Sequence, residues 1–447
     1  MLQVTNKKPN SFIEPHNFAS CQLSNFPHFS LNCLYLWGKL RDFSINAFLI
    51  QQLFRNFARM KLHAPVFPLA LCLMAGIATG RWLGDWTVGL AVLVPLVGVT
   101  CLLSRCPRWQ TAALWACMAV LGATLGARSK YQDGRKAINQ QSYLLRQQLT
   151  DRYRQWGISD GAMGVVAAMT LGEKSQLDRG LKETYSRAGA SHILALSGLH
   201  LMIIYAFVSL FISWRRFRTV SQVVIVAALW AFAYLTGMSP SVVRSAFMIS
   251  LYALLSLGYR ERMSVNTLAL TAIVMLVVNP QSLYDISFQL SFMAVLAILL
   301  FNPLFNLLIP LHVQQRHRWL RVWWGMTAVS LSAQLGTAPL VAYYFGRFST
   351  WFLLSNYVVI PLATVILYLT LACLLTCWWT WLQHLVAVAL SAVVIGMNRL
   401  LEAVTQLPFC TVDGLQPSWQ QVALIYIIIG SAWAVLSLRF AGVRQSV

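Results

Sequence analysis

The sequence is poor in charged residues, which make up 11% of its 447 residues, against about 25% in an average soluble domain. Acidic residues are the scarcer kind: 13 Asp and Glu stand against 34 Lys and Arg, for a formal net charge of +21. Apolar residues make up 58% of the chain. This composition excludes a secreted disulfide scaffold, a soluble dinucleotide-binding enzyme and a soluble nucleic-acid-binding domain.

Several functional motifs are also lacking. No Gly-x-x-x-x-Gly-Lys-Ser/Thr phosphate-binding loop occurs, and the segment 172–175 resembles only the end of one. The first 60 residues show no pattern of a removable signal peptide. The nine cysteines are scattered, mostly inside apolar segments, where Cys acts as a small hydrophobe. Cys373 and Cys377 are one helical turn apart but have no neighbouring His or carboxylate, so we expect no metal and no cofactor.

Apolar runs of about 20 residues, each long enough to cross the hydrocarbon layer as a helix, recur from Pro65 to Leu438. We therefore predict an all-α, polytopic membrane helical bundle with about 12 transmembrane helices. The predicted spans lie near 65–83, 86–104, 110–127, 193–213, 219–236, 240–258, 264–279, 286–310, 323–345, 352–376, 384–407 and 420–438.

These spans divide the chain into four parts. Residues 1–59 form an N-terminal extension that we expect to precede the native start at Met60; the alternative is an interfacial amphipathic helix over its second half. Residues 60–127 hold three transmembrane helices. Residues 128–192 are predicted as a basic linker with amphipathic helices, and 193–447 form the main transmembrane domain.

Basic loops orient the bundle, because Lys and Arg collect on the cytoplasmic side. Strict alternation of the spans then places both termini in the cytoplasm and residues 128–192 outside. That outer segment carries 11 Lys or Arg against 6 acids, which suits an incoming anion or, equally, a solvated helical linker. The short loops that this orientation places inside carry Arg105 and Arg108, Arg215, Arg216 and Arg218, Arg260 and Arg262, Arg316, Arg318 and Arg321, and Arg439 and Arg444.

The stretch 188–202 places two histidines and small polar residues in an apolar helix start: His192, Ser197, Gly198 and His200. The histidines are eight residues apart, too far along a helix to share one ion. Ser197 and His200 are one turn apart, as in a Ser-His hydrolase dyad, but no orienting acid is nearby. The third interpretation is a hydrogen-bonding and packing motif at the mouth of a polar path.

The blocks Leu171-Gly-Glu-Lys-Ser and Ala190-Ser-His-Ile-Leu-Ala-Leu-Ser-Gly-Leu-His closely resemble the signature of the ComEC family, the inner-membrane channel of natural competence. The resemblance implies a channel, and no enzyme, that carries single-stranded DNA into the cytoplasm during transformation, with 193–447 as the channel domain. Further matching blocks are 240–248, 279–292, 333–340, 345–348 and Asn356 before Pro361.

The chain departs from the full family pattern in two places. The 30 or so polar residues at 128–159 are too few for the extracellular OB-like domain, and no His-x-His-x-Asp-His cluster of a metallo-β-lactamase-like domain occurs. The resemblance implies as partners single-stranded DNA, an extracytoplasmic DNA receptor, a cytosolic helicase or ATPase, the lipid bilayer of the bacterial inner membrane and further copies in a homo-oligomer.

A path for DNA needs few acids, and five polar residues are candidates to line it: Arg244 near the outer end of its span, Arg347 in an outer loop, and the amides Gln289, Gln334 and Asn356 in apolar surroundings. The arginines could bind phosphate or, for Arg244, extend to the membrane interface; the amides could instead bond neighbouring helices. Asp285 precedes an apolar run and is predicted as a helix N-cap, and Glu402 is expected to pair with Arg399. The alternative functions are an intramembrane Ser-His hydrolase and a small-solute transporter.

Overall fold

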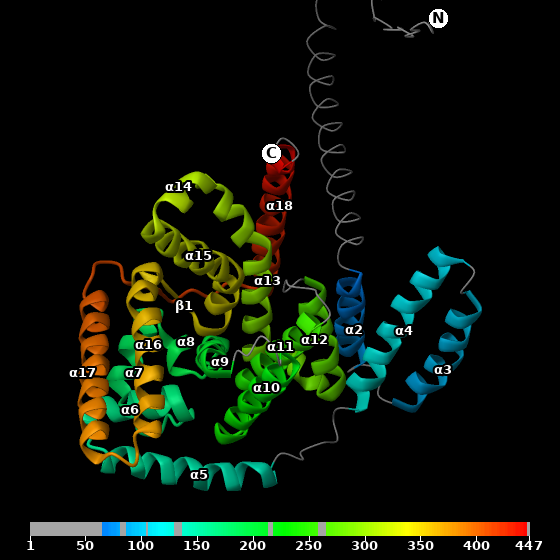
Figure 1. The fold of residues 1–447 in the computed structure, drawn as a ribbon. Coiled ribbons are helices and arrows are strands. Elements are labelled where there is room, and N and C mark those ends of the chain that lie inside the picture. Colours follow the sequence, from blue (N-terminus) through cyan, green and yellow to red (C-terminus); the bar gives the residue numbers. More distant parts are fainter. Residues whose placement is uncertain are drawn as a thin grey trace, which may run out of the picture. The chain divides into compact units, whose positions relative to one another are not determined.

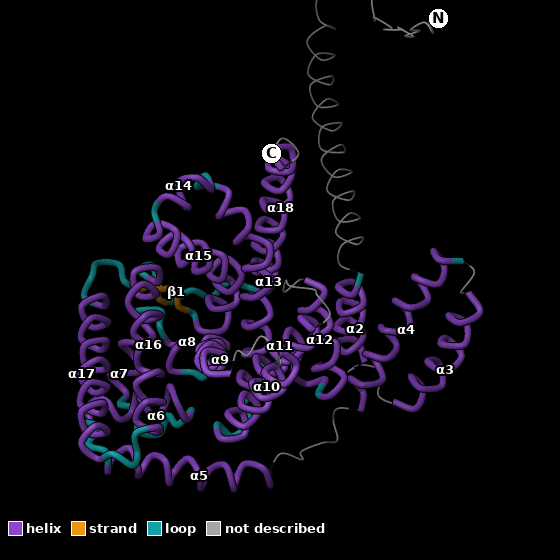
Figure 2. Tube along the Cα trace, viewed as in Figure 1, coloured by secondary structure: helices purple, strands orange, loops and turns teal. Residues whose placement is uncertain are grey.

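The computed structural model describes residues 65–80, 86–103, 106–128, 136–212, 218–257 and 265–444; the prediction for 1–59 lies outside them. Helices dominate (Figure 1), as the tube in Figure 2 also shows. The first half contains α2 (Val66–Gly80), α3 (Trp86–Leu102), α4 (Pro107–Arg128), α5 (Lys136–Gln155), α6 (Asp160–Leu171), α7 (Arg179–Arg187), α8 (Ser191–Leu194) and α9 (Gly198–Ile212).

The second half is also helical. These are α10 (Arg218–Leu235), α11 (Pro240–Leu257), α12 (Val265–Val278), the 3-10 helix η4 (Pro280–Tyr284), α13 (Ile286–Leu307), α14 (Leu311–Arg316), α15 (Arg318–Phe345), α16 (Phe352–Leu375), α17 (Thr380–Thr405) and α18 (Trp419–Arg444). Two short strands, β1 (Arg347–Ser349) and β2 (Thr411–Asp413), pair antiparallel, with Phe348 opposite Val412. The predicted all-α membrane class is confirmed.

A helix lies within each of the twelve predicted spans, but the described helices differ in length. Five are long and apolar enough to cross a membrane: 107–127 in α4, α13, α16, α17 and 419–438 in α18. Others are shorter, such as α12 with 14 residues, which extends about 21 Å at 1.5 Å per residue. The count of twelve crossings therefore stays a prediction.

Helices α2 and α4 pack backbone to backbone through small residues. A Cβ atom added to Gly76 would lie 2.0 Å from the carbonyl oxygen of Ala119, and one added to Gly80 would lie 2.1 Å from that of Ala123. Gly122 approaches the backbone of α2 in the same way. This close packing of small residues is typical of helix pairs in membranes, and α2 then joins α12 and α13 in one apolar core.

The segment predicted as a linker packs against the long apolar helices near the C-terminus. Helices α5, α6, α7 and α8 bury their apolar side chains against α16 and α17. Ten of the twelve residues of α6 are buried, because a helix that is apolar on all faces needs cover on all faces. The extracytoplasmic location of residues 128–192 stays a prediction.

The contacts of α5, which lies across the ends of α10 and α17 (Figure 1), bear on the predicted alternation of the spans. The Tyr234 hydroxyl donates to Gln141 Oε1 (3.1 Å), the turn at Gly237 lies against Arg146, and Gly157, just after α5, lies against His384. With its many Arg and Gln residues, α5 is too polar to cross a bilayer, which predicts that both contacted turns face one side. Five predicted spans separate them, and an odd number would place them on opposite sides.

Candidate functional site

The candidate motif 188–200 forms a break between two helices. The chain leaves α8 after Leu194, Ala195 is extended (φ −94°, ψ 131°), and α9 begins at Gly198. Gly189 has a φ of +78°, and a Cβ atom there would lie 2.9 Å from Ser349 Cβ. Gly189 is therefore required both by its backbone conformation and by the close approach of the residue that ends β1.

Ser197 and His200 contact each other at the start of α9. The backbone N–H of Ser197 donates to His200 Nδ1 (3.2 Å), and the Ser197 hydroxyl oxygen lies 2.9 Å from the same nitrogen. A side chain three residues into a helix that accepts the N-cap N–H is half of a capping box. Because Nδ1 accepts, the ring proton must sit on Nε2, which is buried and makes no hydrogen bond to the described residues.

His192 lies apart from this contact. Its Nδ1 is 3.2 Å from the carbonyl oxygen of Gly189, so it belongs to the turn before α8. Within the part of the chain that the structure describes, no group of three His, Cys, Asp or Glu side chains could hold a metal ion.

Arg244 and Asp285 form an ion pair between α11 and α13. Arg244 is 2% exposed, and its Nη1 lies 3.6 Å from Asp285 Oδ2. Its Nη2 donates to the carbonyl oxygen of Ser287 (2.8 Å). Asp285 is the N-cap of α13, where its Oδ1 accepts the N–H of Ser287 (3.1 Å). The Arg244 guanidinium is thus enclosed by protein and paired with Asp285.

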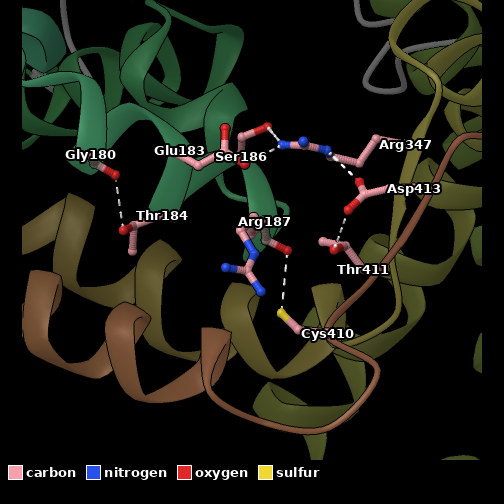
Figure 3. Close-up of polar contacts among 9 residues, drawn as sticks. All are labelled: Gly180, Glu183, Thr184, Ser186, Arg187, Arg347, Cys410, Thr411 and Asp413. Carbon is pink, nitrogen blue, oxygen red and sulfur yellow. Dashed lines mark hydrogen bonds and ion pairs between the residues drawn. The ribbon is translucent and has the colours of Figure 1, made fainter.

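Arg347 ties together three segments that are far apart in the sequence (Figure 3). From β1 it donates to Asp413 Oδ1 on β2 (2.6 Å), to Glu183 Oε1 on α7 (2.9 Å) and to Ser186 Oγ (3.2 Å). Partial burial acts to lower the pKa of Arg347, but the hydrogen bonds and charges of the two carboxylates outweigh it and raise this pKa above its ordinary value. The guanidinium of Arg347 is therefore already paired with two carboxylates, those of Glu183 and Asp413.

Two of the three candidate amides bond neighbouring helices. Gln289 donates to the carbonyl oxygen of Leu283 (3.0 Å) and accepts from the Tyr344 hydroxyl (2.7 Å), which joins α13 to α15. Asn356 donates to Ser330 Oγ (3.2 Å), while its own Oδ1 is buried and has no partner within the part of the chain that the structure describes. Gln334 lies half-buried on α15. The candidates thus belong to several interfaces and do not converge on one point.

Sequence reasoning missed the partners of the buried polar groups. It did not find Asp285 as the counter-ion of Arg244, and it paired Glu402 with Arg399, whereas both are exposed and none of the described ion pairs joins them. The available signal was the rule that a charge in apolar surroundings has a partner. That rule states that a partner exists but does not say which residue it is.

Comparison with known proteins connects this arrangement to a family. A family described as "Competence protein" matches residues 169–439, from the end of α6 into α18. ComE operon protein 3 of Bacillus subtilis (strain 168) is 32% identical over 204 residues, which cover 45% of this chain and 25% of that protein. An uncharacterized protein of Aquifex aeolicus (strain VF5) is 29% identical over 204 residues, 44% of each chain. The similarity thus spans less than half of either curated relative, and no solved structure matches.

Proposed function

Since the chain belongs to the Competence protein family, we propose that it is a component of the inner-membrane channel that carries single-stranded DNA into the cytoplasm during natural transformation. The match confirms the resemblance drawn from residues 171–200. The finer statements about substrate, direction and partners are our proposal.

The observation that carries the proposal is the scarcity and neutralisation of carboxylates from α9 to α18. The described part of this region holds three: Asp285, Glu402 and Asp413. Asp285 pairs with Arg244, and Asp413 pairs with Arg347. A polyanion moving along these helices therefore meets little uncompensated negative charge, while half-buried amides such as Asn356 supply neutral polar groups.

The break at Ala195–Ser197 supports the same proposal. Irregular backbone at membrane depth is tolerated where protein covers it or where it lines water. Next to this break, β1 and α16 approach Gly189, and α11 approaches Gly198 at the start of α9. We place the entrance of the path at this turn.

A channel alone cannot draw the strand inward. A membrane potential that is negative inside opposes each entering charge by about 2.3 kcal/mol per 100 mV. We therefore propose that a cytosolic helicase or ATPase supplies the bias and that an extracytoplasmic receptor delivers the strand.

A Ser-His hydrolase remains the second candidate because the Ser197 hydroxyl lies within 2.9 Å of His200 Nδ1. A nucleophile of this kind is activated by a base that a third group orients. His200 Nε2 has no hydrogen-bond partner among the described residues, and Nδ1 already accepts the Ser197 N–H. This geometry favours a helix cap over a catalytic base.

The direct test is genetic. The encoding gene is deleted in a transformable host, and transformation frequency is measured with and without complementation by the full chain and by a version that starts at Met60. We expect deletion to abolish transformation and complementation to restore it. Unchanged transformation after deletion would rule out the proposed function.

A second test uses purified protein and separates a DNA channel from a small-solute transporter. Oligothymidylate binding should weaken with salt, with a log–log slope near roughly −0.7 per phosphate contact. A solute transporter would bind no oligonucleotide even at low salt.

A further inference from the structure

Arg244 has more hydrogen-bond donors than the protein satisfies. A guanidinium carries five N–H donors. In Arg244 one donates to the Ser287 carbonyl oxygen, and the Nε donor is buried and has no partner among the described residues. The distance from Nη1 to Asp285 Oδ2 is 3.6 Å, beyond hydrogen-bond range. A fully buried cation normally has its donors filled. Arg244 therefore has donors that a further acceptor could fill.

The acceptor position lies at the N-terminus of α13, a helix of 22 residues. Helix N-termini attract anions through their free N–H groups and the helix dipole. Asp285 now fills this position: Oδ1 accepts the Ser287 N–H while Oδ2 faces Arg244. Its side chain is 39% exposed, so solvent and solutes reach the carboxylate even though Arg244 behind it is covered.

We propose that Arg244 and the first turn of α13 form a phosphate-binding site that Asp285 occupies as an internal substitute anion. An incoming phosphate takes the place of the Asp285 carboxylate and accepts charge-assisted hydrogen bonds from the unfilled donors of Arg244, beginning with Nη1, which faces that carboxylate. The identification of that phosphate as part of a DNA strand rests on the proposed function. Inorganic phosphate has the same chemistry, and the experiment separates the two sources.

The informative variant is Asp285→Asn. Asn caps helices about as well as Asp, so the start of α13 is kept while the competing charge is removed. We expect Asp285→Asn to bind fluorescent oligothymidylate at least threefold more tightly than the wild type in detergent or nanodiscs. The double variant Asp285→Asn with Arg244→Gln should show no gain. Asp285→Ser, which also caps helices, serves if Asp285→Asn does not fold.

A second measurement uses inorganic phosphate and needs no DNA. Phosphate should raise the melting temperature of the Asp285→Asn protein more than an equal ionic strength of chloride does, because a ligand that binds the folded state stabilises it. The double variant should lack this increase. If phosphate acts equally on both variants, the site does not exist.

The two measurements also separate this site from the proposed function. Phosphate stabilisation that depends on Arg244, without oligonucleotide binding by any variant, would retain the site and contradict DNA as its ligand. Oligonucleotide binding by the wild type, with no change in Asp285→Asn, would retain the channel function and overturn the site.

Discussion

Tyr185 on α7 donates a 2.7 Å hydrogen bond to Asn398 Oδ1 on α17. Both side chains are buried, Tyr185 completely. The two residues are 213 positions apart, and their contact fastens the segment before the candidate motif to one of the long apolar helices. The Gly189–His200 turn follows directly on α7, so this bond also fixes the position of the turn.

The Tyr185→Phe variant should destabilise the protein. The substitution removes the donor and leaves the buried Asn398 oxygen unpaired, which costs about 1–3 kcal/mol. Thermal unfolding of the purified protein in detergent measures the effect. Tyr143→Phe is the matched control, since Tyr143 is 47% exposed on α5. Equal melting temperatures for the two variants would show that the bond contributes nothing to stability.

The α2–α4 contact predicts an asymmetry between glycines. Gly76→Leu places a side chain where a Cβ atom alone would lie 2.0 Å from a backbone oxygen of α4, so the helices must separate. Overpacking of this kind costs about 1–3 kcal/mol or more. Gly98→Leu on α3 is the control, because a Cβ atom added there would have no neighbouring atom within 4 Å. Comparable loss of folded protein in both variants would contradict backbone-to-backbone packing.

Arg347 should contribute more to stability than an ordinary surface arginine. Arg347→Ala leaves Glu183 and Asp413 without their shared partner, and we expect a loss of roughly 1–2 kcal/mol because charge-assisted hydrogen bonds are strong but these are partly exposed. Arg154→Ala is the control: its pair with Asp151 spans 3.7 Å and is well exposed. The Arg347 effect should also shrink in high salt. A loss no larger than that of Arg154→Ala would argue against the three-segment tie.

The local part of this architecture is readable from the sequence, and the non-local part is not. Apolar runs locate the helices, and an acid directly before Ile286 indicates an N-cap at Asp285, because both signals lie within one or two turns. The partners of Arg347 lie 164 and 66 positions away. Composition and spacing carry no information about which distant residues meet, so they place Arg347 on a DNA path without its two carboxylates.

The predicted topology also depends on contacts that the sequence does not reveal. The alternation of spans is a counting rule, and one helix that does not cross the bilayer inverts every later loop. The contacts of α5 predict that the α10–α11 turn and the α16–α17 turn lie on the same side. Reporter fusions after Gly237 and after Trp378, which is 95% exposed, test this directly. Opposite readouts would restore strict alternation and contradict the placement of α5 at a membrane surface.

The role of His200 can be decided by a substitution that keeps one function and removes the other. Gln is a standard third residue of a capping box, so His200→Gln can still accept the Ser197 N–H but cannot act as a general base. A cap predicts that His200→Gln retains transformation and melting temperature close to the wild type, whereas His200→Ala loses about 1 kcal/mol of stability.

A catalytic dyad predicts a different result for His200→Gln. Both His200 variants would then lose function to the same extent, Ser197→Ala would match them, and a fluorophosphonate probe would label Ser197 in the wild type alone. The two hypotheses differ in the behaviour of His200→Gln. If this variant has normal stability but no transformation, the result supports a catalytic role and contradicts helix capping. Normal transformation by His200→Gln would instead support helix capping. It would also show that the Nε2–H of His200, which has no partner among the described residues, is not needed for transformation.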